Sequence, residues 1–123
     1  MNASLQDPWF EAQFYGQATD YSYRLQGGEI EGAQGLFSWC PCGYGRPEYP
    51  LEGPRPHAII VPFANPRNAP EVPAGHGPER RGGGARPRWT MSGTGLGDLT
   101  LSPSIDVGTP SCWHGYVRGG VVS

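Results

Sequence analysis

Cys40-Pro41-Cys42-Gly43 and Cys112-Trp113-His114-Gly115 are the two stretches that decide the fold, because they contain every cysteine of this 123-residue sequence. In each stretch one residue separates two metal-binding side chains, so a tight turn or a strand can point both toward one side. Three thiolates and an imidazole form a known closed ligand set for structural zinc. We therefore predict a single structural Zn²⁺, linking segments about seventy residues apart, held by Cys40, Cys42, Cys112 and His114.

The composition combines many turn-forming residues with many aromatic ones. There are 20 Gly and 14 Pro, a proportion typical of chains with little regular structure. Four Trp, six Tyr and four Phe are nevertheless too many for a disordered chain. We expect a mainly β protein: a small single domain of sheets and hairpins, stapled by the Cys₃His zinc site and carrying long Pro/Gly-rich loops.

The predicted domain organisation has two parts. Residues 1–20 mix aromatic and polar side chains without a clear period, so we predict an N-terminal arm, with a short local helix as an equal alternative. Residues 21–123 form the zinc-stapled β domain, with a Pro/Gly/Arg-rich insertion at 64–87. The arm and the insertion carry too little apolar surface to order alone, so we expect them to order against neighbouring subunits.

Alternation and turn residues predict strands in the rest of the chain. Residues 36–40 read as a strand that leads into the first cysteine pair, and the apolar run 57–63 reads as a buried strand whose Pro62 marks its end or a sheet edge. A glycine turn at 93–97 predicts a hairpin over 88–102. Gly119-Gly120 predicts a second hairpin at the C-terminus.

Every one of the nine basic residues is arginine, while the net charge of −2 gives no general attraction to nucleic acid or to anionic lipid. The chain shows neither a signal peptide nor an apolar run of membrane-spanning length, so we expect a cytosolic origin and no membrane partner. Guanidinium groups suit phosphates and acidic protein faces alike. We therefore predict partner contacts at Arg80, Arg81, Arg86, Arg88 and the neighbouring Trp89.

The remaining histidines and serines receive structural interpretations. His57 begins an apolar strand, so we read it as a core-edge histidine or as an outer partner of the metal ligands. His76 lies between two glycines and is expected to be solvated. The segment Ser102-Pro103-Ser104 could suggest a nucleophile, but it has no base beside it in the sequence, so it is read as a turn that ends a strand.

Five motifs follow one another along the chain: Trp39-Cys40-Pro41-Cys42-Gly43, His57, Arg86-Pro87-Arg88-Trp89-Thr90, Leu99-Thr100-Leu101-Ser102-Pro103-Ser104-Ile105 and Cys112-Trp113-His114-Gly115-Tyr116-Val117-Arg118-Gly119-Gly120. In this order they resemble a family of small phage and prophage proteins that genome records often label "ammonia monooxygenase". The resemblance implies a compact β protein with Cys and His positions suited to zinc. The label implies no chemistry, because an oxygenase would need more open-site ligands than three histidines provide.

These observations lead to one functional prediction and two alternatives. We predict a non-enzymatic structural protein of a phage virion, such as a capsid decoration protein, made in the host cytoplasm and partnered by other viral structural proteins or by itself. The first alternative is an intracellular phage protein that binds nucleic acid or a host factor through the arginine-rich loop. The second is a zinc hydrolase with His57 or Asp106 as general base, which a closed ligand set opposes.

Overall fold

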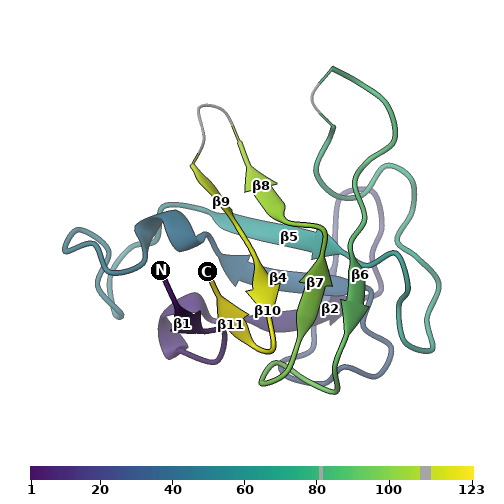
Figure 1. Cartoon of the computed structure of the whole chain (residues 1–123). Helices are drawn as coiled ribbons and strands as arrows, with labels where there is room; N and C mark the ends of the chain where they lie inside the picture. The colour runs from purple at the N-terminus through teal and green to yellow at the C-terminus, as the bar shows by residue number, and fades with distance from the viewer. Residues whose placement is uncertain (81, 109–111) are drawn as a thin grey trace.

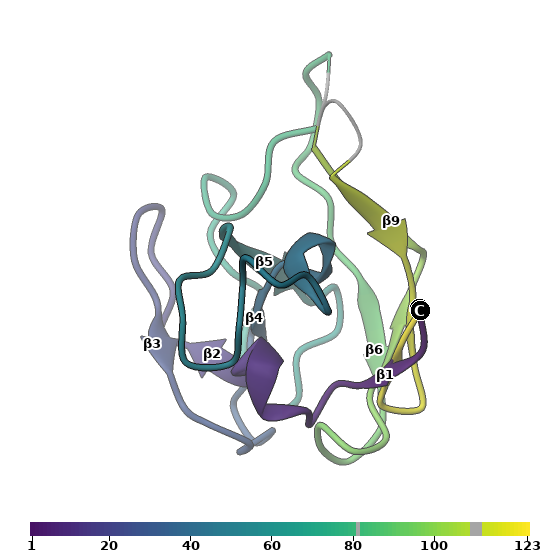
Figure 2. The ribbon, with the colours of Figure 1, turned by 90° about the vertical axis from the view of Figure 1, so that its left-hand side faces the viewer.

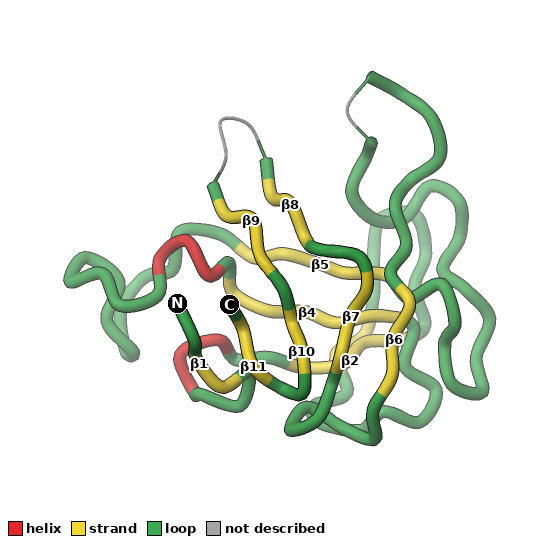
Figure 3. Tube along the Cα trace, in the orientation of Figure 1, coloured by secondary structure: helices red, strands yellow, loops and turns green. Residues whose placement is uncertain are grey.

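The computed structural model describes residues 1–80, 82–108 and 112–123, and its strands form two layers (Figure 1). One layer is a four-stranded antiparallel sheet, and strands β6 (Thr90–Ser92), β7 (Thr100–Ser102) and β10 (Val117–Arg118) of the other layer run steeply across it (Figure 1). The view from the side shows the two layers next to one another (Figure 2). Loops make up much of the rest (Figure 3). The prediction of a small, mainly β, single domain is confirmed.

The four-stranded sheet has the order β3-β2-β4-β5, with strands Gln13–Gly16 (β2), Arg24–Leu25 (β3), Gly35–Trp39 (β4) and Ala58–Pro62 (β5). Its longest ladder joins β4 to β5, from the pair Gly35 and Pro62 to the pair Trp39 and Ala58. β4 is buried on both faces, because Leu36 packs in the main core and its neighbour Phe37 packs in a second cluster with Tyr15 and Val72. β5 is the last strand of this sheet among the described residues, so Pro62 does lie on an edge strand.

The second layer consists of three short sheets whose strands are Ala3–Ser4 (β1), Thr90–Ser92 (β6), Thr100–Ser102 (β7), Ile105–Val107 (β8), Trp113–Gly115 (β9), Val117–Arg118 (β10) and Val121–Val122 (β11). Their orders are β1-β11-β10, β6-β7 and β8-β9. Both predicted hairpins are present: β6 pairs with β7, and β10 turns into β11 at Gly119 and Gly120. These two glycines have φ of 56° and 77°, which a side chain would disfavour.

The helical segments that the structure describes are two short 3₁₀ turns, Pro8–Phe10 (η1) and Pro41–Gly43 (η2). None of the described helices is long and apolar enough to cross a membrane.

The hydrophobic core fills the space between the two layers. Phe10, Phe14, Phe63 and Leu99 have no exposed surface, and Trp89 joins them with 7 % of its surface exposed. Phe14 lies against Phe63 with ring centroids 6.2 Å apart, which ties β2 to the end of β5. The core therefore draws on the whole length of the chain.

The N-terminal twenty residues lie inside this fold, whereas the sequence suggested a separate arm. β1 pairs with β11, so the two ends of the chain are neighbours in one sheet. Trp9, Phe10 and Tyr15 are buried, and the indole of Trp9 donates to the carbonyl of Tyr49. The predicted boundary after residue 20 falls between β2 and β3, which are paired strands of one sheet. Aromatic side chains of this segment supply core surface, so it needs no partner subunit to bury them.

The long 64–87 insertion is also anchored within the chain. Val72 is buried, and the buried amide of Gln34 donates to the carbonyl of Pro70. His76 was expected to be solvated, but it is 98 % buried. Both ring nitrogens have polar partners in this position: Nδ1 lies 2.7 Å from the Thr19 carbonyl, and Nε2 lies 3.3 Å from the Tyr15 hydroxyl.

Candidate functional site

The β4–β5 ladder brings a histidine beside the first cysteine. β4 ends at Trp39 and β5 begins at Ala58, so the next pair in the same register is Cys40 and His57. The amide of Cys40 donates to the carbonyl of His57 over 2.9 Å, which confirms that the pairing continues. After Cys40, the turn η2 folds Cys42 back, with the Gly43 amide donating to the Cys40 carbonyl.

Cys112 completes a group of four side chains that could hold a metal ion. The donor atoms of Cys40, Cys42, His57 and Cys112 all lie within 4.8 Å of one another. The Sγ atoms of Cys40 and Cys112 are 3.7 Å apart, and Nε2 of His57 lies 3.6 Å from Cys42 Sγ and 3.1 Å from Cys112 Sγ. Tetrahedral zinc would set sulfurs about 3.8 Å apart and a sulfur about 3.6 Å from the nitrogen. The spacing therefore fits a four-coordinate ion.

The protonation of the three thiols differs across this cluster. Burial raises the pKa of Cys40 well above its ordinary value, and burial followed by the hydrogen bond with Cys112 raises the pKa of Cys42. Burial also opposes a thiolate at Cys112, but hydrogen bonds from Cys42, His57 and Cys40 together outweigh it and lower the pKa of Cys112. Without a metal, the cluster therefore favours neutral thiols at Cys40 and Cys42, which a metal ion would have to deprotonate.

The structure places three of the four predicted ligands together and replaces the fourth. His57, expected to be a core-edge residue or an outer partner, occupies the position that the sequence suggested for His114. Cys112 precedes β9 instead of lying within it, so period-two alternation does not carry over from Cys112 to His114. His114 points elsewhere: its Nε2 lies 3.0 Å from Oγ of Ser104.

Ser104 and His114 face one another across the β8–β9 hairpin. Ile105 is 97 % buried and turns the opposite face of β8 into the core, which leaves Ser104 and Asp106 on the outer face. The ladder pairs Asp106 directly with His114, a position in which Cβ atoms lie about 5 Å apart. The carbonyl of Ser104 accepts a hydrogen bond from the buried indole of Trp89, which fixes the backbone at the serine.

A hollow of about 540 Å³ opens in front of this serine. Ser104 and Asp106 form one side of it, and Arg80, Arg88 and Trp89 contribute to the other. The Ser104 hydroxyl, which lies within hydrogen-bond distance of the His114 imidazole, thus lines a space that can admit a substrate, and the Asp106 side of the hairpin lines it too. Nucleophilic catalysis by serine requires a base within about 2.6–3.2 Å of the hydroxyl, and His114 meets that requirement.

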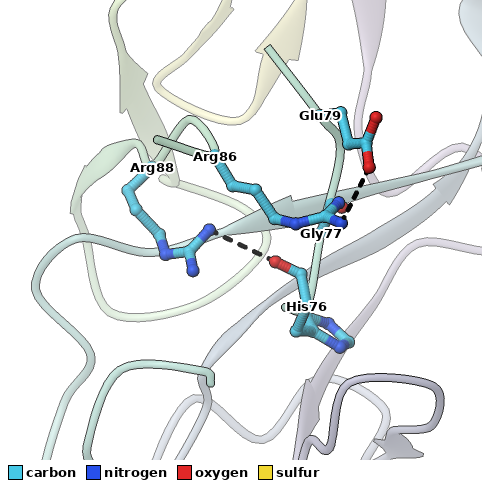
Figure 4. Close-up of polar contacts among 5 residues, drawn as sticks. All are labelled: His76, Gly77, Glu79, Arg86 and Arg88. Atoms are coloured by element: carbon cyan, nitrogen blue, oxygen red, sulfur yellow. Dashed lines mark hydrogen bonds and ion pairs between the residues drawn. The ribbon is translucent and has the colours of Figure 1, made fainter. Parts of the chain in front are cut away.

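The arginines predicted to contact a partner are used mostly within the chain. Arg86 bonds the carbonyl of Gly77 and forms an ion pair of 3.2 Å with Glu79, while Arg88 donates to the carbonyl of His76 (Figure 4). These bonds tie Arg86 and Arg88 to residues 76–79. Trp89 lies in the core and cannot stack on a base, and Arg81 lies outside the described residues.

Sequence reasoning missed Ser104 because its base comes from the opposite strand of a hairpin. The segment 102–104 was read as a strand-ending turn with no adjacent base. The spacing in the sequence could have indicated the pair. Ile105 pairs with Gly115 in the β8–β9 hairpin, so Ser104 and His114, ten positions apart, lie next to this pair on opposite strands. His57 could likewise have been found by pairing the two apolar segments that flank the first cysteine turn.

Comparison with protein families gives a match to the C-terminal part of the chain. Residues 75–123, less than half of the chain, match a family model described as "Bacterial ubiquitination-like system serine protease (BubE)". The matched segment includes Ser104, Asp106, Cys112 and His114, and it leaves out the other three residues of the metal-binding group. Neither the curated proteins nor the solved structures provide a match.

This match corrects the functional predictions made from the sequence. A phage virion protein without enzymatic activity is contradicted, because the matching family is described as a serine protease of a bacterial system. The predicted location in a virion is contradicted for the same reason, and so is the alternative of an intracellular phage protein. The resemblance to a phage protein family finds no support among the comparisons.

Proposed function

We propose that this chain is a serine peptidase in which Ser104 is the nucleophile and His114 its general base. One observation carries the proposal: Oγ of Ser104 lies 3.0 Å from Nε2 of His114, within the segment that matches the serine protease family model. A sequence match alone would leave the nucleophile unnamed. The contact between Ser104 and His114 supports Ser104 as the nucleophile, and so does the hollow that Ser104 lines.

The chemistry follows from this pair. The neutral imidazole, with its proton on Nδ1, accepts the hydroxyl proton at Nε2 as Oγ attacks the carbonyl carbon of a peptide bond. His114 then passes that proton to the leaving amine, and an acyl group remains on Ser104. Water, deprotonated by the same imidazole, attacks the acyl carbon and releases the acid and the free serine. Each proton taken up by His114 is returned within the cycle.

Asp106 supplies a negative charge on the same face of the hairpin. It lies opposite His114 in the ladder, so its carboxylate can favour the imidazolium that forms during the attack. General acid–base assistance by a positioned side chain is worth about 10²- to 10⁴-fold in rate. We expect the Asp106→Asn variant to lose a smaller part of this factor than the His114→Ala variant, because the base itself remains.

We further propose that the metal-binding group holds a structural zinc ion. Three cysteines and one histidine form a closed set with no open position for substrate water, which suits a structural role. Cys112 lies two residues before His114, immediately before the strand that carries the proposed base. The ion would therefore anchor β9 to the β4–β5 ladder and hold the base in place without taking part in the reaction.

Labelling with an ethyl fluorophosphonate tests the catalytic pair without knowledge of the substrate, because this reagent phosphonylates activated serines. We expect one adduct per chain, on the peptide that contains Ser104, and labelling slowed about 10²- to 10⁴-fold in the His114→Ala variant. The Ser102→Ala variant is the matched control, because Ser102 is exposed and lies two residues upstream. Adducts that persist in the Ser104→Ala variant would refute the assignment.

A further inference from the structure

The free edge of β5 is the feature on which this inference rests. In an antiparallel ladder, residues whose backbone groups face the partner strand alternate with residues whose groups face away. The bonds from the Cys40 amide to the His57 carbonyl and from the Phe63 amide to the Gln34 carbonyl set this alternation. Residues 59 and 61 thus face β4, and the amide and carbonyl groups of Ala58 and Ile60 point away from it.

The C-terminal end of this edge already holds a main-chain partner. The amide of Trp89 donates to the carbonyl of Pro62, and the amide of Ala64 donates to the carbonyl of Trp89, a parallel bridge on the outer side of β5. In the part of the chain that the structure describes, no such partner continues to Ala58 and Ile60. Next to this bridge, the outward N–H and C=O groups of Ala58 and Ile60 therefore remain available to a further strand.

The unpaired groups border a hollow that leads toward Ser104. A space of about 460 Å³ is lined by residues 57–61, from His57 into β5, and by residues 105–108, which include β8. It shares Trp89, Pro78 and Asp106 with the hollow in front of Ser104, so the two spaces adjoin. In the ribbon, β8 lies above β5 and rises away from it (Figure 1). A chain along β5 would thus approach the nucleophile.

We propose that the substrate of the peptidase binds as an extended polypeptide segment that adds to the free edge of β5 and pairs with the backbone of Ala58 and Ile60. The inference rests on the proposed function and specifies how its substrate is recognised. Strand addition supplies affinity through main-chain hydrogen bonds and tolerates many side chains. Pairing at residues 58 and 60 brings the peptide past Trp89, so that the bond to be cleaved lies at Ser104. A folded or helical segment cannot make these bonds, so cleavage requires an unfolded or terminal segment.

Replacing Ile60 by proline tests the pairing. The outward N–H of residue 60 disappears, while the bonds from β4 to residues 59 and 61 remain, and Pro62 shows that proline is tolerated in this orientation. Ile60→Ala is the matched control, because it removes the same side chain and keeps the N–H. The probes are an ethyl fluorophosphonate and a positional-scanning library of acetyl-tetrapeptidyl diphenyl phosphonates, both of which modify the nucleophilic serine.

We expect Ile60→Pro to slow labelling by the peptidyl phosphonates about five- to tenfold, the effect of losing one backbone hydrogen bond, with unchanged labelling by the fluorophosphonate. Ile60→Ala should label like the unaltered protein. If Ile60→Pro does not fold, N-methylated members of the library replace it: methylation at one alternating set of positions should slow labelling of the unaltered protein. Amide hydrogen exchange of the peptidyl adduct should show new protection at Ala58 and Ile60.

Three outcomes would overturn the inference, and they separate it from the proposed function. If the peptidyl phosphonates label Ile60→Pro as fast as the unaltered protein, or if N-methylation does not slow labelling, strand addition is refuted and the peptidase assignment stays intact. Exchange protection that appears at Asp106 and not at Ala58 or Ile60 places the peptide on β8 instead. Failure of both reagents to modify Ser104 in the unaltered protein removes the peptidase assignment and this inference together.

Discussion

Replacement of Cys112 by serine should destabilise the metal-loaded protein by about 4 kcal/mol, because it opens the link between the two cysteine segments. Cys40 and Cys112 are 72 residues apart, and a cross-link that closes a loop of this length removes about 4 kcal/mol of unfolded-state entropy in the chain-entropy model. Domains of this size are typically stable by about 5–15 kcal/mol, so the loss is a large part of the total. The remaining three ligands would hold the ion more weakly, which adds to the effect.

Urea unfolding with one equivalent of zinc, compared with unfolding in excess chelator, measures this loss. At a slope of about 2 kcal/mol/M, the midpoint of the zinc-loaded variant should fall by about 2 M. In chelator the variant and the unaltered protein should unfold alike, because Cys112 is exposed and its side chain adds little packing. Equal midpoints of the two proteins in zinc would refute the reasoning, and so would a loss of the same size in chelator.

Three further predictions concern packing and ionisation. Gly35→Ala should lower the free energy of unfolding, measured by urea denaturation, by about 1–3 kcal/mol, because a Cβ at this position would overlap the fully buried ring of Tyr15. Gly28→Ala is the control and should be neutral, because its Cβ would meet only one Leu96 methyl group at 3.9 Å. Asp7 accepts a hydrogen bond of 2.6 Å from the Tyr44 hydroxyl, which lowers the pKa of the Asp7 carboxyl in the folded state. Asp7→Asn should therefore be less stable than the unaltered protein above about pH 4, and the difference should disappear as the pH falls through the folded-state pKa. Unfolding is measured in chelator, so that loss of metal at low pH does not contribute. Metal affinity, measured by competition with a chelator, should rise between about pH 6 and pH 8, because burial raises the pKa of Cys40 and Cys42 and both thiols must lose a proton to bind; equal affinity at the two pH values would contradict the assignment of these ligands.

Local signals in the sequence predicted much of the fold. Glycine turns gave the hairpins over 90–102 and 117–122, and apolar runs gave β4 and β5, because these features depend on neighbouring residues. The N-terminal segment was misread since its aromatic spacing fits an arm, a helix or core strands equally well. Burial of its side chains depends on β11 and on the β4–β5 sheet, which lie far away in sequence.

The site was predicted less completely, for a related physical reason. The sequence predicted the three ligands that lie in its two short cysteine motifs, Cys40, Cys42 and Cys112. It missed His57, which enters the group through the register of β4 and β5. The pairing of Ser104 with His114 likewise depends on a hairpin register and not on adjacency in sequence. A function predicted from composition, short motifs and a family resemblance therefore missed the contact between Ser104 and His114.

The central claim, that Ser104 and His114 form a catalytic pair, is tested most directly by acylation with p-nitrophenyl acetate and mapping of the acetyl group. The claim predicts a burst of about one equivalent of p-nitrophenol per chain and an acetyl group on Ser104, as expected when an acyl-enzyme forms faster than it is hydrolysed. The burst should be lost in the Ser104→Ala variant and strongly slowed in the His114→Ala variant. An acetyl group on Cys42 or Cys112, or a burst that persists without Ser104, would contradict it.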